Sequence, residues 1–113
     1  MTEFRTKRIY DDAAKADGHR VLVDRIWPRG IKKEDAGVDA WPKEIAPSSK
    51  LRKRFHSDDD YRSFKRDYNS ELDDSDDYDD FVDDLKSHKT VTLLTAAKDP
   101  DRSHVSVLLD RLQ

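Results

Sequence analysis

The stretch RVLVDRI at residues 20–26 decides the fold, because it is a short, β-branched run typical of a buried central strand. It ends at WPRG, residues 27–30, where proline fixes its own backbone angle φ and glycine permits a sharp reversal. A second run of this kind, TVTLLTAA, occupies residues 90–97. Both runs are apolar and are followed by polar loops, so we expect them to be adjacent, parallel strands of one sheet.

The segments around these two runs predict one further strand and several helices. Residues 4–10 suit a first strand, with Phe4, Ile9 and Tyr10 as candidate buried positions, and residues 11–19 suit a loop. A helical turn is expected over 32–36, and Pro42 makes 38–45 an edge strand or an irregular crossover.

Three helices are predicted by apolar stripes, and a fourth is predicted after Pro47-Ser48-Ser49 with a serine as N-cap. The stripes consist of Tyr61, Phe64, Tyr68 and Leu72, of Tyr78, Phe81, Val82 and Leu85, and of Val105, Leu108, Leu109 and Leu112. Strands that alternate with helices indicate an α/β fold, a mostly parallel sheet flanked by helices.

Composition limits the classes of protein that fit. A chain of 113 residues has room for one core, so we expect a single domain over 1–113. The absence of cysteine excludes disulfides and thiolate chemistry. No secretory signal and no apolar stretch of about 20 residues is present, so we expect a cytoplasmic protein without a membrane partner.

Charge is distributed unevenly along the chain. Residues 1–57 carry 14 Lys and Arg against 9 Asp and Glu, whereas residues 58–84 carry 3 against 13. This separation can steer an anion to one face of the fold. The alternative for the acidic block is a solvated surface that aids solubility.

The first candidate site is DRIWPRG at 24–30, directly after the predicted central strand. Ligands of open α/β sheets bind beyond the carboxyl ends of the strands. Arg25 and Arg29 can grip a phosphate or carboxylate, and Trp27 can stack on or shield a ligand. The alternative is that Asp24 pairs with a neighbouring arginine while Trp27 fills the end of the core.

The second candidate site follows the other confident strand. Lys98 offers a point charge, and Ser103 or Asp101 can cap the last helix, whose N-terminus attracts anions. His104 is the group best suited to proton transfer near neutral pH. The alternatives are that His104 is structural or solvated and that Asp99 braces Lys98.

The third candidate site is WPKEIAPSS at 41–49, with Lys43, Glu44 and Ser48 before the basic run KLRKR at 50–54. A capped, basic helix start can hold phosphate. The run could instead contact a nucleic-acid backbone or form a solvated helix face.

Several motifs are absent. There is no Gly-rich phosphate loop, HExxH, GxSxG or CxxC, so no cofactor is expected. The histidines show no metal-ligand spacing, and the sequence therefore predicts no bound metal; they are His19, His56, His88 and His104.

The chain resembles the YeaO-like proteins, the family catalogued as domain of unknown function 488. The resemblance rests on VLVDRIWPRG at 21–30, WPKEIAPSSKLRKRF at 41–55, FKRDYNSEL at 64–72 and TLLTAAKD at 92–99. It implies a single α/β domain and no particular activity. The positions that carry over are Asp24, Arg25, Trp27, Arg29, Lys43, Glu44, Ser48, Lys98 and Asp99.

Three positions depart from the family pattern. The family commonly has an aromatic residue in place of Thr95, a tryptophan in place of Arg54, and often an asparagine in place of Ser103. A ligand site that uses those groups would be altered in this chain.

These observations favour a domain that binds a small anionic ligand, either as a binding protein or as an enzyme on a phosphorylated or carboxylated metabolite or a nucleotide. Arg25, Arg29 and Lys98 would bind the anion, and Asp24 or His104 would transfer protons. The alternatives are a nucleic-acid-associated regulatory protein and a structural interaction module in which carboxylates pair the arginines. The oligomeric state is left open by the sequence.

Overall fold

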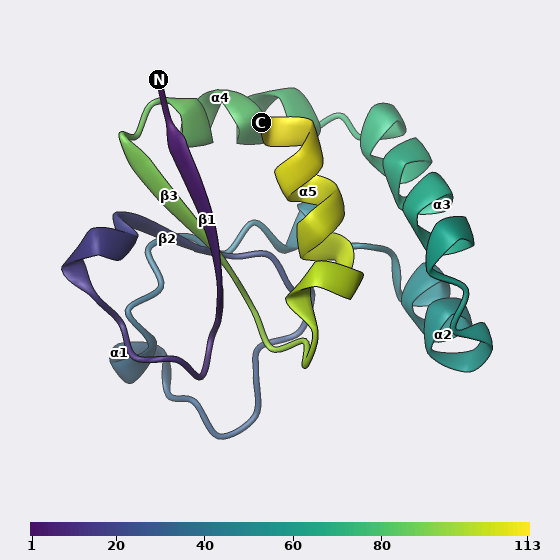
Figure 1. Ribbon diagram of the computed structural model, residues 1–113, viewed down its shortest axis with the longest axis horizontal. Helices are drawn as coiled ribbons and strands as arrows, with labels where there is room; N and C mark the ends of the chain where they lie inside the picture. Colours follow the sequence, from purple (N-terminus) through teal and green to yellow (C-terminus); the bar gives the residue numbers. More distant parts are fainter.

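The computed structural model describes residues 1–113 and is built on three parallel strands. The sheet has the order β1-β3-β2 and consists of β1 (Glu3–Arg8), β2 (His19–Leu22) and β3 (Thr90–Thr95) (Figure 1). Val21 pairs with Leu93 and Leu22 with Leu94. The predicted parallel adjacency of the two apolar runs is therefore confirmed, and so is the α/β class.

The strands are shorter than their apolar runs. The ladder continues past β2 with a hydrogen bond of 3.1 Å from Val23 N–H to the Leu94 carbonyl, but Ile26 is 61% exposed. The extension of this strand to residue 26 was wrong, because the chain leaves the sheet where Asp24 turns towards β3. Tyr10 was also wrongly predicted as buried: it is exposed, with the Arg8 guanidinium 5.1 Å from its ring centre.

The rest of the regular structure consists of five α-helices and three short 3₁₀ helices. The α-helices are α1 (Lys33–Ala36), α2 (Ser49–Asp58), α3 (Tyr61–Asp74), α4 (Tyr78–Lys86) and α5 (His104–Leu112). The 3₁₀ helices are Lys15–Asp17, Lys43–Ile45 and Pro100–Arg102. The predicted loop over 11–19 therefore holds one helical turn, and the crossover over 38–45 is irregular, with a single bridge from Ala40 to Val21.

Side-chain oxygens at the N-caps account for where three of these helices begin. The Ser48 hydroxyl accepts a hydrogen bond of 3.2 Å from Leu51 N–H at the start of α2. Asp60 caps α3 and Ser103 caps α5. Each cap provides a hydrogen-bond acceptor for a first-turn amide that has no partner within the helix. The predicted serine cap of α2 is therefore confirmed, and of the two candidates for α5 the cap is Ser103 and not Asp101.

The core lies between the sheet and the helices of one face. Helix α5 contacts β1 and β3, and α3 packs against α5 and α2 (Figure 1). The three predicted stripes supply much of this core; Tyr61, Tyr78 and Val82 are half-buried at its margin, and Leu109 is half-buried outside it. The buried members are Phe64, Tyr68, Leu72, Phe81, Leu85, Val105, Leu108 and Leu112.

The Asp-rich stretch 73–84 lies on the surface, as predicted. Its aspartates are exposed, while Phe81 and Leu85 of α4 are buried against the core. None of the helices combines the length and the apolar character that crossing a bilayer requires.

Candidate functional site at the carboxyl ends of the strands

A cleft of about 930 Å³ opens beyond the carboxyl ends of β2 and β3. Its walls come from the loop after β2, the loop after β3, the first turn of α5 and one side of α2. Seven of the predicted site residues line it: Asp24, Arg25, Trp27, Arg29, Lys98, Asp99 and His104. The first and second candidate sites of the sequence therefore form one cavity, because their strands are parallel neighbours.

Asp24 is held at the base of this cleft by three donors. Its Oδ1 accepts hydrogen bonds from the Thr95 hydroxyl at 2.7 Å and from His104 Nε2 at 2.8 Å. Its Oδ2 accepts one of 2.8 Å from Ala96 N–H. Thr95, which stands where the family commonly has an aromatic residue, thus ties the ends of β2 and β3 together.

Burial alone would raise the pKa of the Asp24 carboxyl, because the charged form loses hydration. The hydrogen bond and charge of His104, with the donors at Ala96 and Thr95, outweigh this effect, so the pKa lies below its ordinary value. Asp24 is therefore an anion at neutral pH, and it accepts protons only weakly.

Arg25 and Trp27 both donate hydrogen bonds to backbone carbonyls. Arg25 donates to the carbonyls of Pro47 and Ala46 at 3.0 and 3.1 Å, which joins the loop after β2 to the start of α2. Trp27 donates its indole N–H to the Ile31 carbonyl at 2.7 Å. Its ring packs edge-on against Trp41, with 5.3 Å between ring centres, covers a second, smaller apolar cluster of Ile9, Leu22 and Leu94, and also lines the cleft.

Four cations of the cleft have no protein partner. The side chains of Arg29, Lys98, Arg52 and Lys53 are exposed and make no hydrogen bond or ion pair. Of the three aspartates on the walls, Asp24 is committed to its three donors and Asp59 to Arg102, with an Nη1–Oδ1 distance of 2.6 Å. Only Asp99 is left to offset the free cations, and the cleft therefore carries excess positive charge.

An aromatic and cationic wall stands beside these free charges. The Arg102 guanidinium lies 5.5 Å from the ring centre of Phe55 and 5.7 Å from that of Tyr61. Tyr61 donates its hydroxyl to the Ser103 carbonyl at 2.8 Å. Phe55 lines the cleft, so a ligand with a planar group meets an apolar surface next to the cations.

The third candidate site joins this cleft only in part: its basic run supplies Arg52 and Lys53, whereas Lys43, Glu44 and Ser48 do not line it. Lys43 is exposed, with its ammonium 4.9 Å from the centre of the Trp41 ring, and Glu44 is exposed without a partner. Ser48 caps α2 and donates its hydroxyl to Glu71 at 2.6 Å. The geometry gives these three side chains local roles away from the cleft.

The basic run at 50–54 was a candidate phosphate site in the sequence, but the sequence analysis did not select Phe55, His56 or Asp59. Arg52, Phe55, His56 and Asp59 follow the spacing i, i+3, i+4, i+7, which places them along one side of a helix, and all four line the cleft. This spacing can be seen in the sequence. It is obscured by the basic run at 50–54, whose charged side chains lie on several sides of the helix.

Comparisons with known proteins find one family model and several relatives that match nearly the whole chain. Residues 3–113 match the family model described as "Inactive DUF488-N3 subclade". The protein YeaO of Escherichia coli K12, described as uncharacterized, is 45% identical over 108 residues, which cover 95% of this chain and 94% of YeaO.

Mycobacterial relatives match at a similar level. Uncharacterized proteins of Mycobacterium bovis and Mycobacterium tuberculosis H37Rv are each 41% identical over 112 residues, or 98% of this chain and 94% of theirs. No solved structure matches the chain.

Proposed function

We propose that this chain, which belongs to the DUF488 family of YeaO-like proteins, binds a small anionic ligand and does not transform it. The ligand class is a phosphorylated or carboxylated metabolite or a nucleotide. The single observation that carries the proposal is the set of four cations without protein partners, Arg29, Arg52, Lys53 and Lys98, around one cleft.

The free cations favour a ligand because nothing in the protein offsets them. The structural alternative requires carboxylates to pair Arg25 and Arg29, but Arg25 bonds to carbonyls and Arg29 to nothing. Like charges gathered on one cavity repel one another, and an anion relieves that repulsion with charge-assisted hydrogen bonds. The first turn of α5 adds the positive end of a helix dipole.

Two observations favour binding over catalysis. The Asp24–His104 pair resembles the pair that orients a general base, but covalent catalysis with such a base also needs a free nucleophile on the protein. Ser103 is the hydroxyl beside His104 on the cleft wall, and its Oγ donates to the Pro100 carbonyl and caps Val105 N–H. The subclade description, which contains the word inactive, agrees with this reading.

A nucleic-acid surface is less well supported. It requires the basic run of α2 to form one continuous exposed face. Arg54 instead pairs with Asp67, whereas Arg52 and Lys53 line the cleft. The exposed aspartates of 73–84 would repel a duplex from that part of the surface.

A thermal-shift screen followed by calorimetry tests the proposal. Inorganic phosphate, citrate, nucleoside mono- and diphosphates and sugar phosphates would be compared at equal ionic strength. A ligand at 100 times its dissociation constant stabilises the folded protein by about 2.7 kcal/mol, which such a screen detects. Anions also differ in their general effect on protein stability, so a site is indicated by a shift that saturates at low ligand concentration.

Matched variants then locate the site. Lys98→Ala should weaken binding of the best anion about 10- to 100-fold, since a hydrogen bond to a charged group is worth roughly 1.5–3 kcal/mol. Lys50→Ala is the control, because Lys50 is an exposed lysine of α2 that does not line the cleft. Equal losses in both variants, or no anion that shifts the melt, would overturn the proposal.

A further inference from the structure

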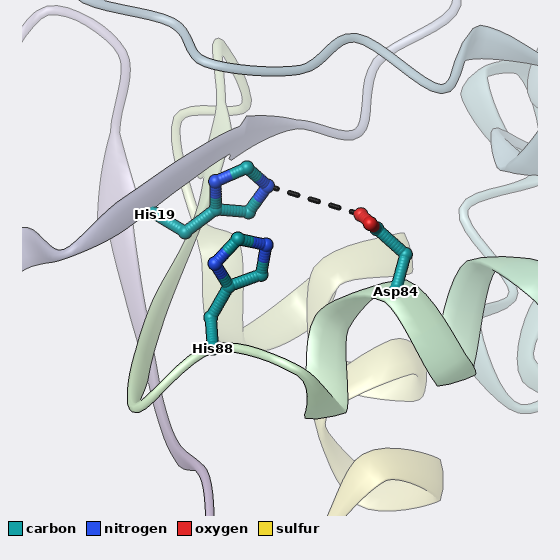
Figure 2. A group of neighbouring side chains, drawn as sticks. All are labelled: His19, Asp84 and His88. Carbon is teal, nitrogen blue, oxygen red and sulfur yellow. Dashed lines mark ion pairs between the residues drawn. The ribbon is translucent and has the colours of Figure 1, made fainter.

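Two histidines and a carboxylate gather at the end of the sheet opposite the cleft. His19 begins β2, His88 lies just before β3, and Asp84 belongs to α4. One ligand atom from each lies within 4.8 Å of the others. Figure 2 shows both imidazole rings with a nitrogen turned towards the Asp84 carboxylate. The cluster therefore combines three potential metal ligands from three different segments.

The strongest sign that this cluster lacks a partner is His19. Its Nε2 atom is buried and has no hydrogen bond, and Asp84 Oδ2 lies 3.9 Å away, which is too far for one. Buried polar atoms are nearly always satisfied, and an exception calls for an explanation such as an ion. A neutral imidazole nitrogen carries the lone pair that metals bind.

We propose that His19, His88 and Asp84 bind one Zn²⁺ ion, with water as the fourth ligand. Two imidazoles and a carboxylate are a donor set typical of zinc, whereas Mg²⁺ and Ca²⁺ prefer oxygen alone. The site lies at the amino ends of β2 and β3, so it is independent of the anion cleft at their carboxyl ends.

Small side-chain movements complete the coordination geometry. Zinc–ligand distances of about 2.0–2.2 Å place neighbouring ligand atoms of a tetrahedron about 3.3 Å apart. The two rings are stacked with 3.7 Å between centres and 8° between planes, so one ring must tilt before both lone pairs meet one ion. Asp84 has a side chain that is 63% exposed and free to swing inwards.

Asp39 is placed to orient His19. Its Oδ2 lies 4.0 Å from His19 Nδ1 and is itself fixed by a hydrogen bond of 2.9 Å from Arg20 N–H. Metal-bound histidines commonly donate their second ring N–H to a carboxylate, which sets the tautomer. At 4.0 Å this contact is not yet a hydrogen bond, and Asp39 is the positioning residue of the proposed site once the ring tilts towards it.

The linear sequence hid this cluster. His19 and His88 are far apart in the chain, and they meet because β2 and β3 are paired with His19 opposite Val91. The expectation of no metal rested on spacing along the chain, which does not reveal ligands that come from different strands.

Calorimetric titration of the full chain with Zn²⁺ tests the proposal, in the presence of excess Mg²⁺ to suppress weak binding to the surface aspartates. One ion should bind per chain. His88→Gln and Asp84→Asn should each weaken binding by more than about tenfold, which is the lower bound for losing even an outer-shell partner of a ligand. His56→Gln is the control, an exposed histidine of α2 without hydrogen bonds.

Co²⁺ provides a second readout, because tetrahedral coordination gives visible absorption bands that should be lost in His88→Gln. Circular dichroism checks that each variant is folded. If His88→Gln does not fold, Asp84→Asn is the variant that tests the proposal, because Asp84 is exposed. The proposal is overturned if the wild type binds no Zn²⁺, if Asp84→Asn binds as tightly as the wild type, or if His56→Gln loses binding equally.

Discussion

His104 Nε2 lies 2.8 Å from Asp24 Oδ1, and both side chains are largely buried, with 15% and 16% of their surfaces exposed. This pair joins the first turn of α5 to the end of β2 and forms the base of the cleft. Asp24→Asn should therefore lower the free energy of unfolding at neutral pH by about 2 kcal/mol. The amide NH₂ of asparagine is a donor and cannot accept a hydrogen bond, so at least one donor around the carboxylate loses its partner. Urea denaturation at pH 7 measures the loss.

The pH dependence of this loss follows from the pKa of Asp24. The folded state lowers this pKa below its ordinary value of 3.8, so the charged carboxylate stabilises the fold above about pH 4. The contribution disappears as the pH falls through the folded-state pKa. The difference between wild type and Asp24→Asn should therefore shrink as the pH is lowered below 3.8 and through the folded-state pKa. A difference that grows on acidification would show that Asp24 is not held as an anion.

Asp17 and Arg20 form a second internal pair, each with 5% of its surface exposed. Asp17 also accepts from Lys7 and from Ala14 N–H. Asp17→Ala should cost about 3–5 kcal/mol of stability, because it leaves a buried guanidinium without its counter-charge.

Glu3→Ala is the control for this prediction. It removes the exposed pair of Glu3 with Arg5, which is worth at most about 1 kcal/mol. Equal losses in the two variants would mean that Arg20 finds sufficient compensation in the carbonyls of Ala36 and Gly37, to which it also donates.

Gly18 makes the turn that leads into β2, at φ +64°, and a Cβ there would lie 2.4 Å from the Thr90 carbonyl oxygen. Gly18→Ala should destabilise the fold through both strain and this collision. Gly30→Ala is the matched control, since Gly30 has φ +78° but open space around it. Thermal unfolding should show a loss for Gly18→Ala at least twice that for Gly30→Ala, and comparable losses would contradict the close approach.

Local patterns were sufficient for the elements of this fold and for much of the cleft. The stripes of α3, α4 and α5 and the cap at Ser48 are consequences of helical period and first-turn hydrogen bonding, which neighbouring residues determine. Asp24 and Lys98 lie in one cleft because both follow apolar runs that pair in parallel.

Tertiary context decided what local patterns did not. The strand over 20–26 ended early because Asp24 finds donors on β3, which is distant in sequence. Ser48 resembled a ligand residue, but Glu71 of α3 takes its hydroxyl. His19 and His88 meet only through the pairing of β2 with β3. In each case the deciding partner comes from another element.

The exposed aspartates of 73–84 should make stability depend on salt. Their mutual repulsion is screened as the Debye length falls to about 10 Å at 0.1 M salt. The melting temperature should therefore rise between low and moderate sodium chloride. Asp76→Asn combined with Asp80→Asn should reduce this rise, because both side chains are exposed and unpaired. A steady fall of the wild-type melting temperature would contradict the prediction.

Arg25 and Arg29 are four residues apart but should respond differently to substitution. Arg25 donates to the carbonyls of Pro47 and Ala46, so Arg25→Ala should lower stability by about 1–3 kcal/mol, the cost of leaving buried acceptors without a donor. Arg29 makes no hydrogen bond or ion pair, so Arg29→Ala should change stability by no more than about 0.5 kcal/mol.

Anion binding should depend on Arg29, although stability without ligand should not. Arg29→Ala should weaken binding of the best anion about 10- to 100-fold while its melting temperature without ligand stays close to that of the wild type. Arg62→Ala is the matched control, an exposed arginine of α3 outside the cleft, and it should bind as the wild type does. If Arg29→Ala instead unfolds the protein while no anion shifts the wild-type melt, the arginine is an internal brace. The charged cluster would then be structural. Arg29 makes no protein contact in this structure, so such a result would mean that it makes stabilising contacts in solution that the structure does not contain.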